Sequence, residues 1–455
     1  MNKYIPFCLI VILAMFACGD SDDSPTPPPP PGGGDGDGEV VIDLTDEELL
    51  DFVQESTFQY FWQYAESNSG AARERYEVQS PNNDAHVVAT GGTGFGLMAL
   101  IAGIERGFIS ADEGTTRIGR ILDFFEHADR FHGAWSHWID GNTGHVLPFS
   151  QKDNGGDLVE TAFFAQGLIA VRNYFKDGNT AQQALSQQAD QLWRGIEWNW
   201  YTNGDNVLYW HWSPDYNFEI GLRIEGYNEC LITYVLAASS PTHTITKDVY
   251  TQGWAKSGNI KSTASKYGYP LVVKHAGNQE YGGPLFFSHY SFLGLNPNGL
   301  ADEYVNYGNA AVNHTLINYN YCIDNPRGYS GYSKNCWGLT ASYSPNGYAA
   351  HSPANDLGII SPTAALSSLP YAPEESLDAM RFFYSIKHMT HGVAGFYDAY
   401  CPQNNWVKKG YLAIDQGPIV VMIENYRSQL FWRLFMNDAE MKAGLTKLGF
   451  TSPNI

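Results

Sequence analysis

The stretch GGDLVETAFFAQGLIAVRNYF, residues 155–175, contains the strongest fold signal in this chain. Apolar residues recur in it at spacings of three and four, at Phe164, Leu168, Val171 and Phe175. That period places them on one stripe of an α-helix, because successive strand residues would alternate between two faces instead. The helix begins where Gly155 and Gly156 end, so the sequence predicts a helix with one buried stripe and an acidic start.

The same period recurs elsewhere, which makes helices the predicted main element. Apolar stripes run through residues 97–108, 118–125 and 185–196. A capping box at Thr45 and Glu48 predicts the start of an earlier helix. Further helices are expected at 225–238, 246–256, 298–312, 376–390, 417–435 and 438–447, with short strands at 206–212 and 269–275.

Long segments rich in Gly, Asn, Tyr and Trp separate these helices. They cover residues 129–156, 201–224, 276–297 and 313–362. Structureless loops of that length are uncommon unless they are functional. Helix and long aromatic loop in alternation predict an all-α fold, an (α/α)6 toroid whose loops form a cleft at one end.

Composition narrows the class of partner. The net charge is -21 with only 27 Lys and Arg, which argues against nucleic acid and anionic membrane surfaces. Tyr and Trp are abundant, at 29 and 12 residues, and such rings stack on the apolar faces of sugars. A large core also buries aromatic residues, but the balance favours an oligo- or polysaccharide partner. No feature indicates an oligomer, so a monomer is expected.

The N-terminus predicts where the protein works. Lys3, the apolar run Ile5–Phe16 and the small residues before Cys18 resemble a bacterial lipoprotein signal, and the run is too short to span a bilayer. Residues 1–17 are thus expected to be a signal peptide, with Cys18 lipidated. Residues 18–40 form an acidic, Pro/Gly-rich tether and 41–455 the functional domain. The expected location is the outer membrane, exposed at the surface or facing the periplasm; a plain secretory signal is the alternative.

Several chemistries lack support in the sequence. The glycine-rich stretch 92–96 opens a helix but is not followed by a second strand ending in an acid, so a dinucleotide site is not expected. No HExxH, CxxC or GxSxG occurs, and His127, His132 and His137 are interpreted as solvated or core residues. No metal or cofactor is therefore expected. Cys322 and Cys336 are close enough in sequence to pair, with Cys230 and Cys401 also remaining, but the sequence leaves the pairing open.

Carboxylates are the better catalytic candidates. Asp157 and Glu160 share one face of the first turn of the predicted helix, although capping alone would also explain them. Glu229 precedes an apolar run, and burial there would raise its pKa as a general acid requires. Asp415 and Asp398 lie in similar apolar surroundings. Glycoside hydrolysis needs two carboxyl groups, one protonated and one ionised.

At these segments the chain resembles the glucoamylase-like domain family, which includes the endo-β-1,2-glucanases of glycoside hydrolase family 144. The resemblance runs through residues 45–450 in order, in FQYFWQYAESNSGAARER, GGDLVETAFFAQGL, RIEGYNEC, GPLFFSHYS, ISPTAALSSLPYAPEES, GFYDAY and IDQGPIVVMIENYRS. It implies an (α/α)6 barrel, no metal, and hydrolysis of a β-linked glucan with inversion. It implies that Glu229 is the proton donor and that Asp157, Glu160 and Asp415 are candidate catalytic acids, with the water-activating base left open among these three.

The resemblance also implies residues that contact substrate: Trp135, Trp138, Trp210, Trp212, Tyr227, His289, Tyr397, Asp398 and Trp406. One departure is FLGLNPNG at 292–299, where the family pattern has a tryptophan and Asp-Phe-Arg. The resulting hypothesis is a tethered glycoside hydrolase that cuts β-1,2-glucan internally. The alternatives are the same fold acting on an α-glucan or another β-glucan, a non-catalytic glycan-binding lipoprotein, or a structural lipoprotein of a transporter.

Overall fold

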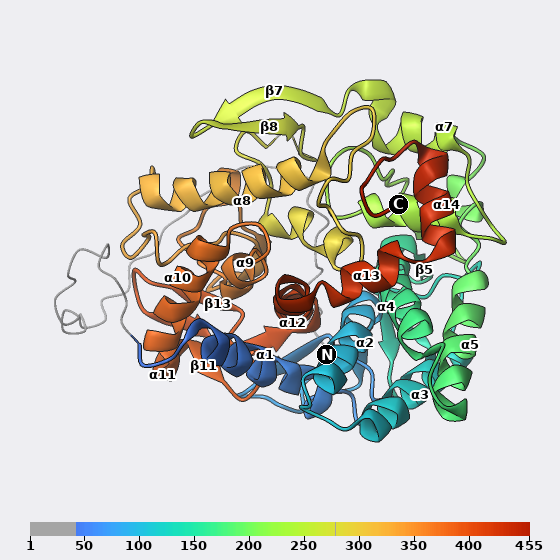
Figure 1. Ribbon diagram of the computed structural model, residues 1–455, viewed down its shortest axis with the longest axis horizontal. Helices are drawn as coiled ribbons and strands as arrows, with labels where there is room; N and C mark the ends of the chain where they lie inside the picture. The colour runs from blue at the N-terminus through green and yellow to red at the C-terminus, as the bar shows by residue number, and fades with distance from the viewer. Residues whose placement is uncertain (1–41, 278) are drawn as a thin grey trace.

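The computed structural model describes residues 42–277 and 279–455, and helices dominate it (Figure 1). The predicted signal peptide and tether, with Cys18, lie outside the described residues. The helices are α1 (Asp46–Trp62), α2 (Thr90–Glu105), α3 (Ala111–His127), α4 (Leu158–Phe175), α5 (Thr180–Arg194), α6 (Leu231–Ser239), α7 (Lys247–Val249), α8 (Tyr307–Asp324), α9 (Pro362–Leu366), α10 (Pro373–Ser385), α11 (Lys387–Thr390), α12 (Ala413–Ser428), α13 (Leu430–Met436) and α14 (Ala439–Leu448).

Local sequence explains where several helices begin. Thr45 accepts a hydrogen bond from the backbone N–H of Glu48, whose carboxylate accepts one from the Thr45 backbone, as the predicted capping box requires. The same reciprocal arrangement opens α3 at Ser110 and α5 at Asn179. Helix α4 begins after Asp157, whose side chain caps it. The predicted first helix and the helix at 158–175 are thus confirmed.

The centre of the molecule is built from helices that are buried on nearly every side. Helix α2 packs against α4 and α12, and α4 also packs against α5, α6 and α13. The contact between α2 and α4 requires glycine, because a Cβ on Gly94 would lie 2.2 Å from the Phe163 carbonyl oxygen. A Cβ on Gly167 would lie 2.4 Å from the Gly94 oxygen. The glycine-rich stretch at 92–96 therefore serves close helix packing.

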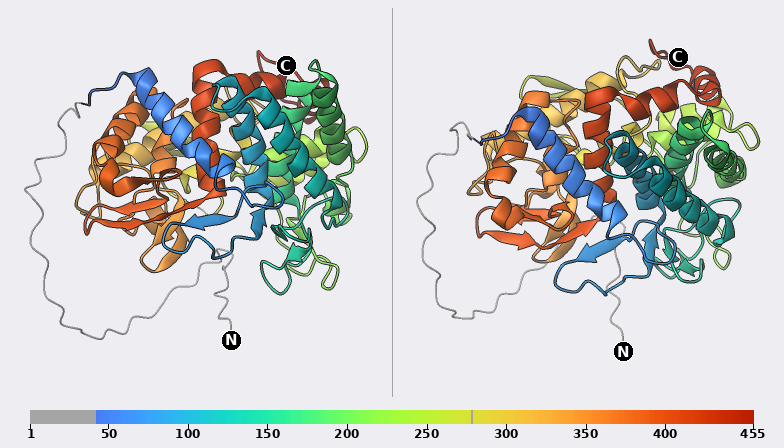
Figure 2. Two further views of the ribbon diagram at one scale, coloured as in Figure 1. Left: turned by 90° about the horizontal axis from the view of Figure 1, so that it is seen from below. Right: turned by 60° about the horizontal axis from the view of Figure 1, so that its bottom comes forward.

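The strands are short and lie in small antiparallel sheets of two or three strands: β1 (Arg75–Glu77), β2 (Val87–Ala89), β3 (Trp138–Asp140), β4 (Val146–Leu147), β5 (Gly156–Asp157), β6 (His211–Trp212), β7 (Lys261–Lys266), β8 (Tyr269–Val273), β9 (Ala341–Ser344), β10 (Gly347–Ala350), β11 (His391–Gly392), β12 (Gly395–Phe396), β13 (Ala399–Cys401), β14 (Trp406–Lys408) and β15 (Gly410–Leu412). Strand β1 pairs with β15, far along the chain, and Figure 2 shows these blue and orange strands on one side of the helices. Strands β6 and β8 occupy the two predicted strand segments.

Three helix predictions need correction. Helix α8 begins at Tyr307, not near 298, because Asp302 accepts hydrogen bonds from the N–H groups of Tyr304 and Val305 and holds a turn there. Helix α6 begins at Leu231, because Gly226 has a φ of +79° and breaks any helix from 225. The predicted helix at 246–256 continues from α7 as a π-helix over Tyr250–Trp254.

The cysteines of the described domain are buried and unpaired: Cys230, Cys322, Cys336 and Cys401. Cys322 and Cys336 belong to one hydrophobic cluster, so their proximity in sequence is used for packing rather than for a disulfide. Among the described residues, no helix has the length and apolar character needed to cross a bilayer.

Candidate active site

The site begins where strand β5 gives way to helix α4. Asp157 is fully buried, and its Oδ1 accepts hydrogen bonds from the N–H groups of Val159 (3.0 Å) and Glu160 (2.9 Å). The β5–β6 pairing sets Asp157 opposite His211. Because the cap fixes the carboxylate, its second oxygen points away from the helix toward two histidines.

His137 connects the two predicted acids of α4. Its Nδ1 lies 3.1 Å from Asp157 Oδ2 and 4.0 Å from Glu160 Oε1. Burial opposes the charged imidazolium, but the two carboxylates outweigh it and raise the pKa of His137 to about 10. Burial likewise opposes ionisation of Asp157, but the hydrogen bond from His137 and the charge of His211 leave its pKa below the usual value. His137 and Asp157 therefore form an ion pair at neutral pH, in which Asp157 is buried and the His137 side chain is 27% exposed.

Glu160 has a different environment from Asp157. Its Oε2 accepts a hydrogen bond from the backbone N–H of Gly91 at 2.8 Å, while Oε1 has only the distant His137 nitrogen. Burial raises the pKa of Glu160 to about 7, with Asp157 adding to the rise and His137 opposing it. Glu160 can therefore gain or lose a proton near neutral pH, whereas Asp157 stays ionised.

Glu229 lies in the turn before α6 and faces the same group. The Ser291 hydroxyl donates to the Glu229 backbone carbonyl and fixes this turn. Glu229 Oε2 is buried and has no hydrogen-bond donor among the described residues. Burial, together with the charges of Glu160 and Asp157, raises the pKa of Glu229 to about 7. The structure thus brings Glu229 together with the two acids of α4.

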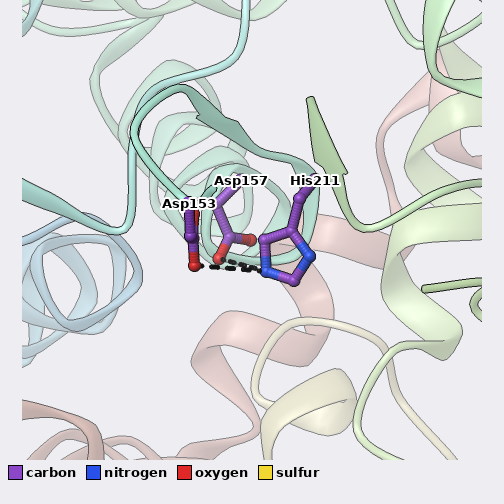
Figure 3. Close-up of side chains that lie close together, drawn as sticks. All are labelled: Asp153, Asp157 and His211. Carbon is purple, nitrogen blue, oxygen red and sulfur yellow. Dashed lines mark ion pairs between the residues drawn. The ribbon is translucent and has the colours of Figure 1, made fainter. Parts of the chain in front are cut away.

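Asp157 also belongs to a cluster with Asp153 and His211 (Figure 3). His211 Nε2 is 3.5 Å from Asp153 Oδ2 and 3.8 Å from Asp157 Oδ2. These three side chains could hold a divalent cation by their distances alone. A metal-binding imidazole almost always donates its other N–H, yet the buried His211 Nδ1 has no acceptor in the described part of the chain. The unpartnered Nδ1 therefore argues against a metal centre at this cluster.

A second pair of carboxyl groups lies at the start of α12. Asp415 occupies the first helical turn, and its Oδ1 is 3.5 Å from the Tyr290 hydroxyl. Asp398 follows β12, and its Oδ2 accepts a hydrogen bond from the Tyr343 N–H at 2.8 Å. Burial and the neighbouring Asp398 raise the pKa of Asp415 well above the usual value. Tyr290 is within electrostatic range of Asp415, Glu229 and Glu160, so it lies between the two groups of acids.

Three predicted substrate contacts are core residues. Trp135 and Tyr227 are 0 % exposed, and His289 is 2 % exposed. Trp135 donates its ring N–H to the Phe125 carbonyl, Tyr227 bonds to Ser288, and His289 bonds to Ser368. Their burial leaves little surface for a sugar to contact. Tyr397 is also in the core at 9 % exposed, whereas the other predicted tryptophans keep more exposed surface: Trp138, Trp210, Trp212 and Trp406.

The sequence reasoning missed four residues of the site: His137, Asp153, His211 and Tyr290. His137 was interpreted as a solvated or core residue, yet it contacts Asp157. The only local signal for His211 is its place within the predicted strand segment 206–212. The partners of these four residues come from distant segments that strand pairing and packing bring together. The spacing of residues within one segment does not reveal such contacts.

This chain is similar to known proteins over most of its length. Residues 221–439 match the Glycoamylase family model, described as "Putative glucoamylase". An exo-β-1,2-glucooligosaccharide sophorohydrolase from Parabacteroides distasonis is 44% identical over 428 residues, covering 89% of this chain. The chain spans 58% of the length of that curated relative.

Solved structures extend the likeness to almost the whole described domain. An endo-β-1,2-glucanase from Chitinophaga pinensis, solved with sophorotriose and glucose, is 57% identical with a TM-score of 0.89, covering 90% of this chain and 100% of its own. A mutant endo-β-1,2-glucanase from Talaromyces funiculosus, solved with β-1,2-glucan, is 12% identical with a TM-score of 0.64. It covers 89% of this chain and 92% of its own, and at that identity the likeness shows a common fold.

Proposed function

This chain belongs to the glucoamylase-like family, and from that premise we propose that it is a glycoside hydrolase that cleaves β-1,2-glucan. The observation that carries the proposal is the convergence of Glu229, Glu160 and Asp157. Two of these carboxyl groups have a pKa raised to about 7 and the third stays ionised. Glycoside hydrolysis needs such differently protonated acids in one site.

We assign the role of general acid to Glu229. Its raised pKa leaves it substantially protonated near neutral pH, and its buried Oε2 has no competing donor in the described residues. A carboxylic acid in that state can protonate the leaving glycosidic oxygen. Asp157 is unsuited to direct chemistry, because its two oxygens already accept hydrogen bonds from the helix and from His137.

We assign the water-activating base to Asp415, with Glu160 as the rival. Among the described residues, Asp415 Oδ1 has only the long contact with the Tyr290 hydroxyl, so it retains the capacity to accept a hydrogen bond from water. Asp415 and Glu229 both lie within electrostatic range of Tyr290, which suits two carboxyl groups that act on one glycosidic bond. Inversion follows from the family resemblance, since an inverting enzyme activates water on the face opposite the acid.

We also propose how the helices and the aromatic loops are arranged. The helices are proposed to form an (α/α)6 toroid, with the aromatic loops building a cleft at one end. The packing of α2, α4 and α12 at the centre supports an inner ring, and the fold likeness to the Talaromyces funiculosus enzyme agrees with it. Trp138, Trp210, Trp212 and Trp406 are proposed to contact sugar in that cleft, together with Tyr397 and Asp398.

The domain plan and location remain proposals carried by the N-terminal sequence. Residues 1–17 are proposed as signal peptide, 18–40 as tether and 41–455 as the hydrolase domain, attached to the outer membrane through lipid on Cys18. A monomer is proposed, because a soluble cleft enzyme on a flexible tether needs no partner chain to complete its site.

Product analysis on a panel of glucans tests the activity. We expect β-1,2-glucan to be cut to a ladder of oligosaccharides, with α-glucans and other β-glucans left intact. The anomeric form of the first products, followed by NMR, tests inversion. Binding without any product would favour the glycan-binding alternative, and cleavage of another glucan would replace the assigned linkage.

A second mode of action has its own support. The 44% identical relative carries the name of an exo-acting enzyme that acts from the non-reducing end. Release of sophorose alone from the earliest time points would assign this chain the exo mode. A ladder of products would assign it the endo mode.

A further inference from the structure

Two buried carboxyl groups face one another at the entrance to helix α12. The Asp398 N–H donates to the carbonyl of Gly410 at 3.0 Å, and Gly410 begins the strand that leads into Asp415. Asp398 is 5 % exposed and Asp415 is 3 % exposed. Their side chains are in hydrogen-bonding contact. Strand β15 therefore holds the two groups together inside the protein.

Each carboxyl group has one satisfied and one unsatisfied oxygen. Asp398 Oδ2 accepts from the Tyr343 N–H, and Asp415 Oδ1 faces the Tyr290 hydroxyl. Asp398 Oδ1 and Asp415 Oδ2 are buried and have no donor among the described residues. Two ionised carboxylates in contact repel each other, and buried oxygens without a donor are costly. A single proton between the two groups removes both penalties.

No ion pair joins a cation directly to either carboxyl group among the described residues. The charged groups that act on the pair are Glu74, which raises the pKa of both, and Lys408, which lowers that of Asp398. Arg75 is bound to Glu74 at 2.6 Å, and Lys408 is bound to Glu77 at 2.7 Å. The other titratable neighbours are tyrosines whose pKa burial raises, so they stay neutral: Tyr60, Tyr290, Tyr343 and Tyr348.

We propose that Asp398 and Asp415 share one proton and carry a single negative charge between them, and that Asp398 is the positioning residue for the base. This inference rests on the proposed function for its catalytic part. When water attacks the anomeric carbon, its proton passes to Asp415 Oδ1 while the proton of Asp415 passes to Asp398. The water oxygen bonds to carbon, the glycosidic bond breaks, and Glu229 protonates the leaving oxygen.

The titration behaviour of the pair agrees with this arrangement. Burial raises the pKa of Asp398 to about 6, while burial and the charge of Asp398 raise the pKa of Asp415 well above its usual value. Both shifts favour one proton held on the pair, with one site free to accept another. The two groups titrate as a unit, not as separate acids.

Infrared spectroscopy of the whole protein tests the shared proton without any substrate. Aspartate labelled with ¹³C at the side-chain carboxyl separates the aspartic acid carbonyl stretch from that of glutamic acid. The measurement is made at about pH 7, where the label keeps any protonated Glu160 or Glu229 out of the aspartic acid band. We expect a protonated aspartic acid band in the folded wild type. A folded wild type without that band would overturn the proposal.

Isosteric variants show which residues give rise to the protonated aspartic acid band. Asp398→Asn and Asp415→Asn should each abolish it, because the new amide donates to the remaining carboxylate and that group ionises. Asp356→Asn is the matched control: Asp356 is 1 % exposed, but its carboxylate already accepts from Tyr321, Tyr332 and Gly358. The control should keep the band. A band that survives both pair variants would overturn the assignment.

Turnover on β-1,2-glucan tests the positioning role. Asp398→Asn leaves Asp415 ionised and able to accept the proton directly, so turnover should fall less than about tenfold. Asp415→Asn should lose about 10²–10⁴-fold. Equal losses in two folded variants would overturn the positioning role. If the glucan is not cleaved at all while the infrared results hold, the proposed function fails and the shared proton stands.

Discussion

His137 Nδ1 lies 3.1 Å from Asp157 Oδ2, and this contact joins a histidine of one segment to the residue that caps helix α4. The same imidazole is 4.0 Å from Glu160 Oε1. One positive charge is thus placed between two buried carboxyl groups. It keeps Asp157 ionised and limits how far the pKa of Glu160 rises. The acids of α4 therefore work as a charged unit with His137.

Replacing Glu229 should abolish turnover while preserving the fold. Glu229→Gln is isosteric but has no acidic proton, and general acid catalysis typically contributes about 10²–10⁴-fold. We expect that loss in kcat with glucan affinity and melting temperature near wild type. Glu225→Gln is the matched control, because Glu225 is partly exposed and pairs with Lys256 at 3.2 Å. A Glu229→Gln enzyme with more than about a tenth of wild-type turnover would remove Glu229 from the acid role.

The ion pair of His137 and Asp157 should make stability depend on pH. The pKa of His137 is raised to about 10 in the folded protein, against about 6.5 when unfolded. Its stabilisation is therefore complete below about pH 6.5 and is lost as the pH rises toward 10. Denaturant unfolding at several pH values should show His137→Gln less stable than wild type by about 1.5–3 kcal/mol at pH 6, with the gap closing toward alkaline pH.

His145→Gln provides the surface control for that experiment. His145 lies 3.2 Å from Asp129, but its side chain is 73% exposed. Exposed pairs contribute about 0–1 kcal/mol, so this variant should differ little from wild type at any pH. A gap for His137→Gln that stays constant from pH 6 to alkaline pH would contradict the charged state assigned to His137.

Three variants that each replace one carboxylate with an uncharged amide should distinguish the catalytic base from the residues that hold the site in place. We expect Asp415→Asn to lose the most turnover and to be rescued in part by azide, a small anion that can replace a missing base. Asp157→Asn should instead lose stability, because asparagine still caps the helix but leaves His137 without its carboxylate. Steady-state kinetics and thermal unfolding measure the two effects. Near wild-type turnover in Asp415→Asn, with Glu160→Gln inactive, would move the base to Glu160.

Lipid attachment is predicted at Cys18, which lies outside the described residues. Cys18→Ala removes the thiol that carries the lipid, so the variant should stay an unprocessed precursor or be released from the membrane. Fractionation and mass spectrometry of the mature N-terminus measure this. An alanine variant that is processed normally and still partitions fully with the membrane would contradict the lipoprotein prediction.

The sequence by itself determined the local elements of this protein. Thr45 and Glu48 predict the start of α1, and the apolar stripe from Phe164 predicts α4. The same reasoning found Asp157 and Glu160 in one helical turn. These features follow from spacings of three and four residues within one segment, so local hydrogen bonding and side-chain periodicity are enough to specify them.

Only the tertiary structure decided which of these residues meet. His137 and His211 reach Asp157 through strand pairing and chain packing, and Asp398 meets Asp415 because its backbone bonds to β15. The structure also buried Trp135, which the sequence alone had offered as a surface for sugar. Such contacts join segments far apart along the chain. They are specified by how the whole core packs, and no local period encodes them.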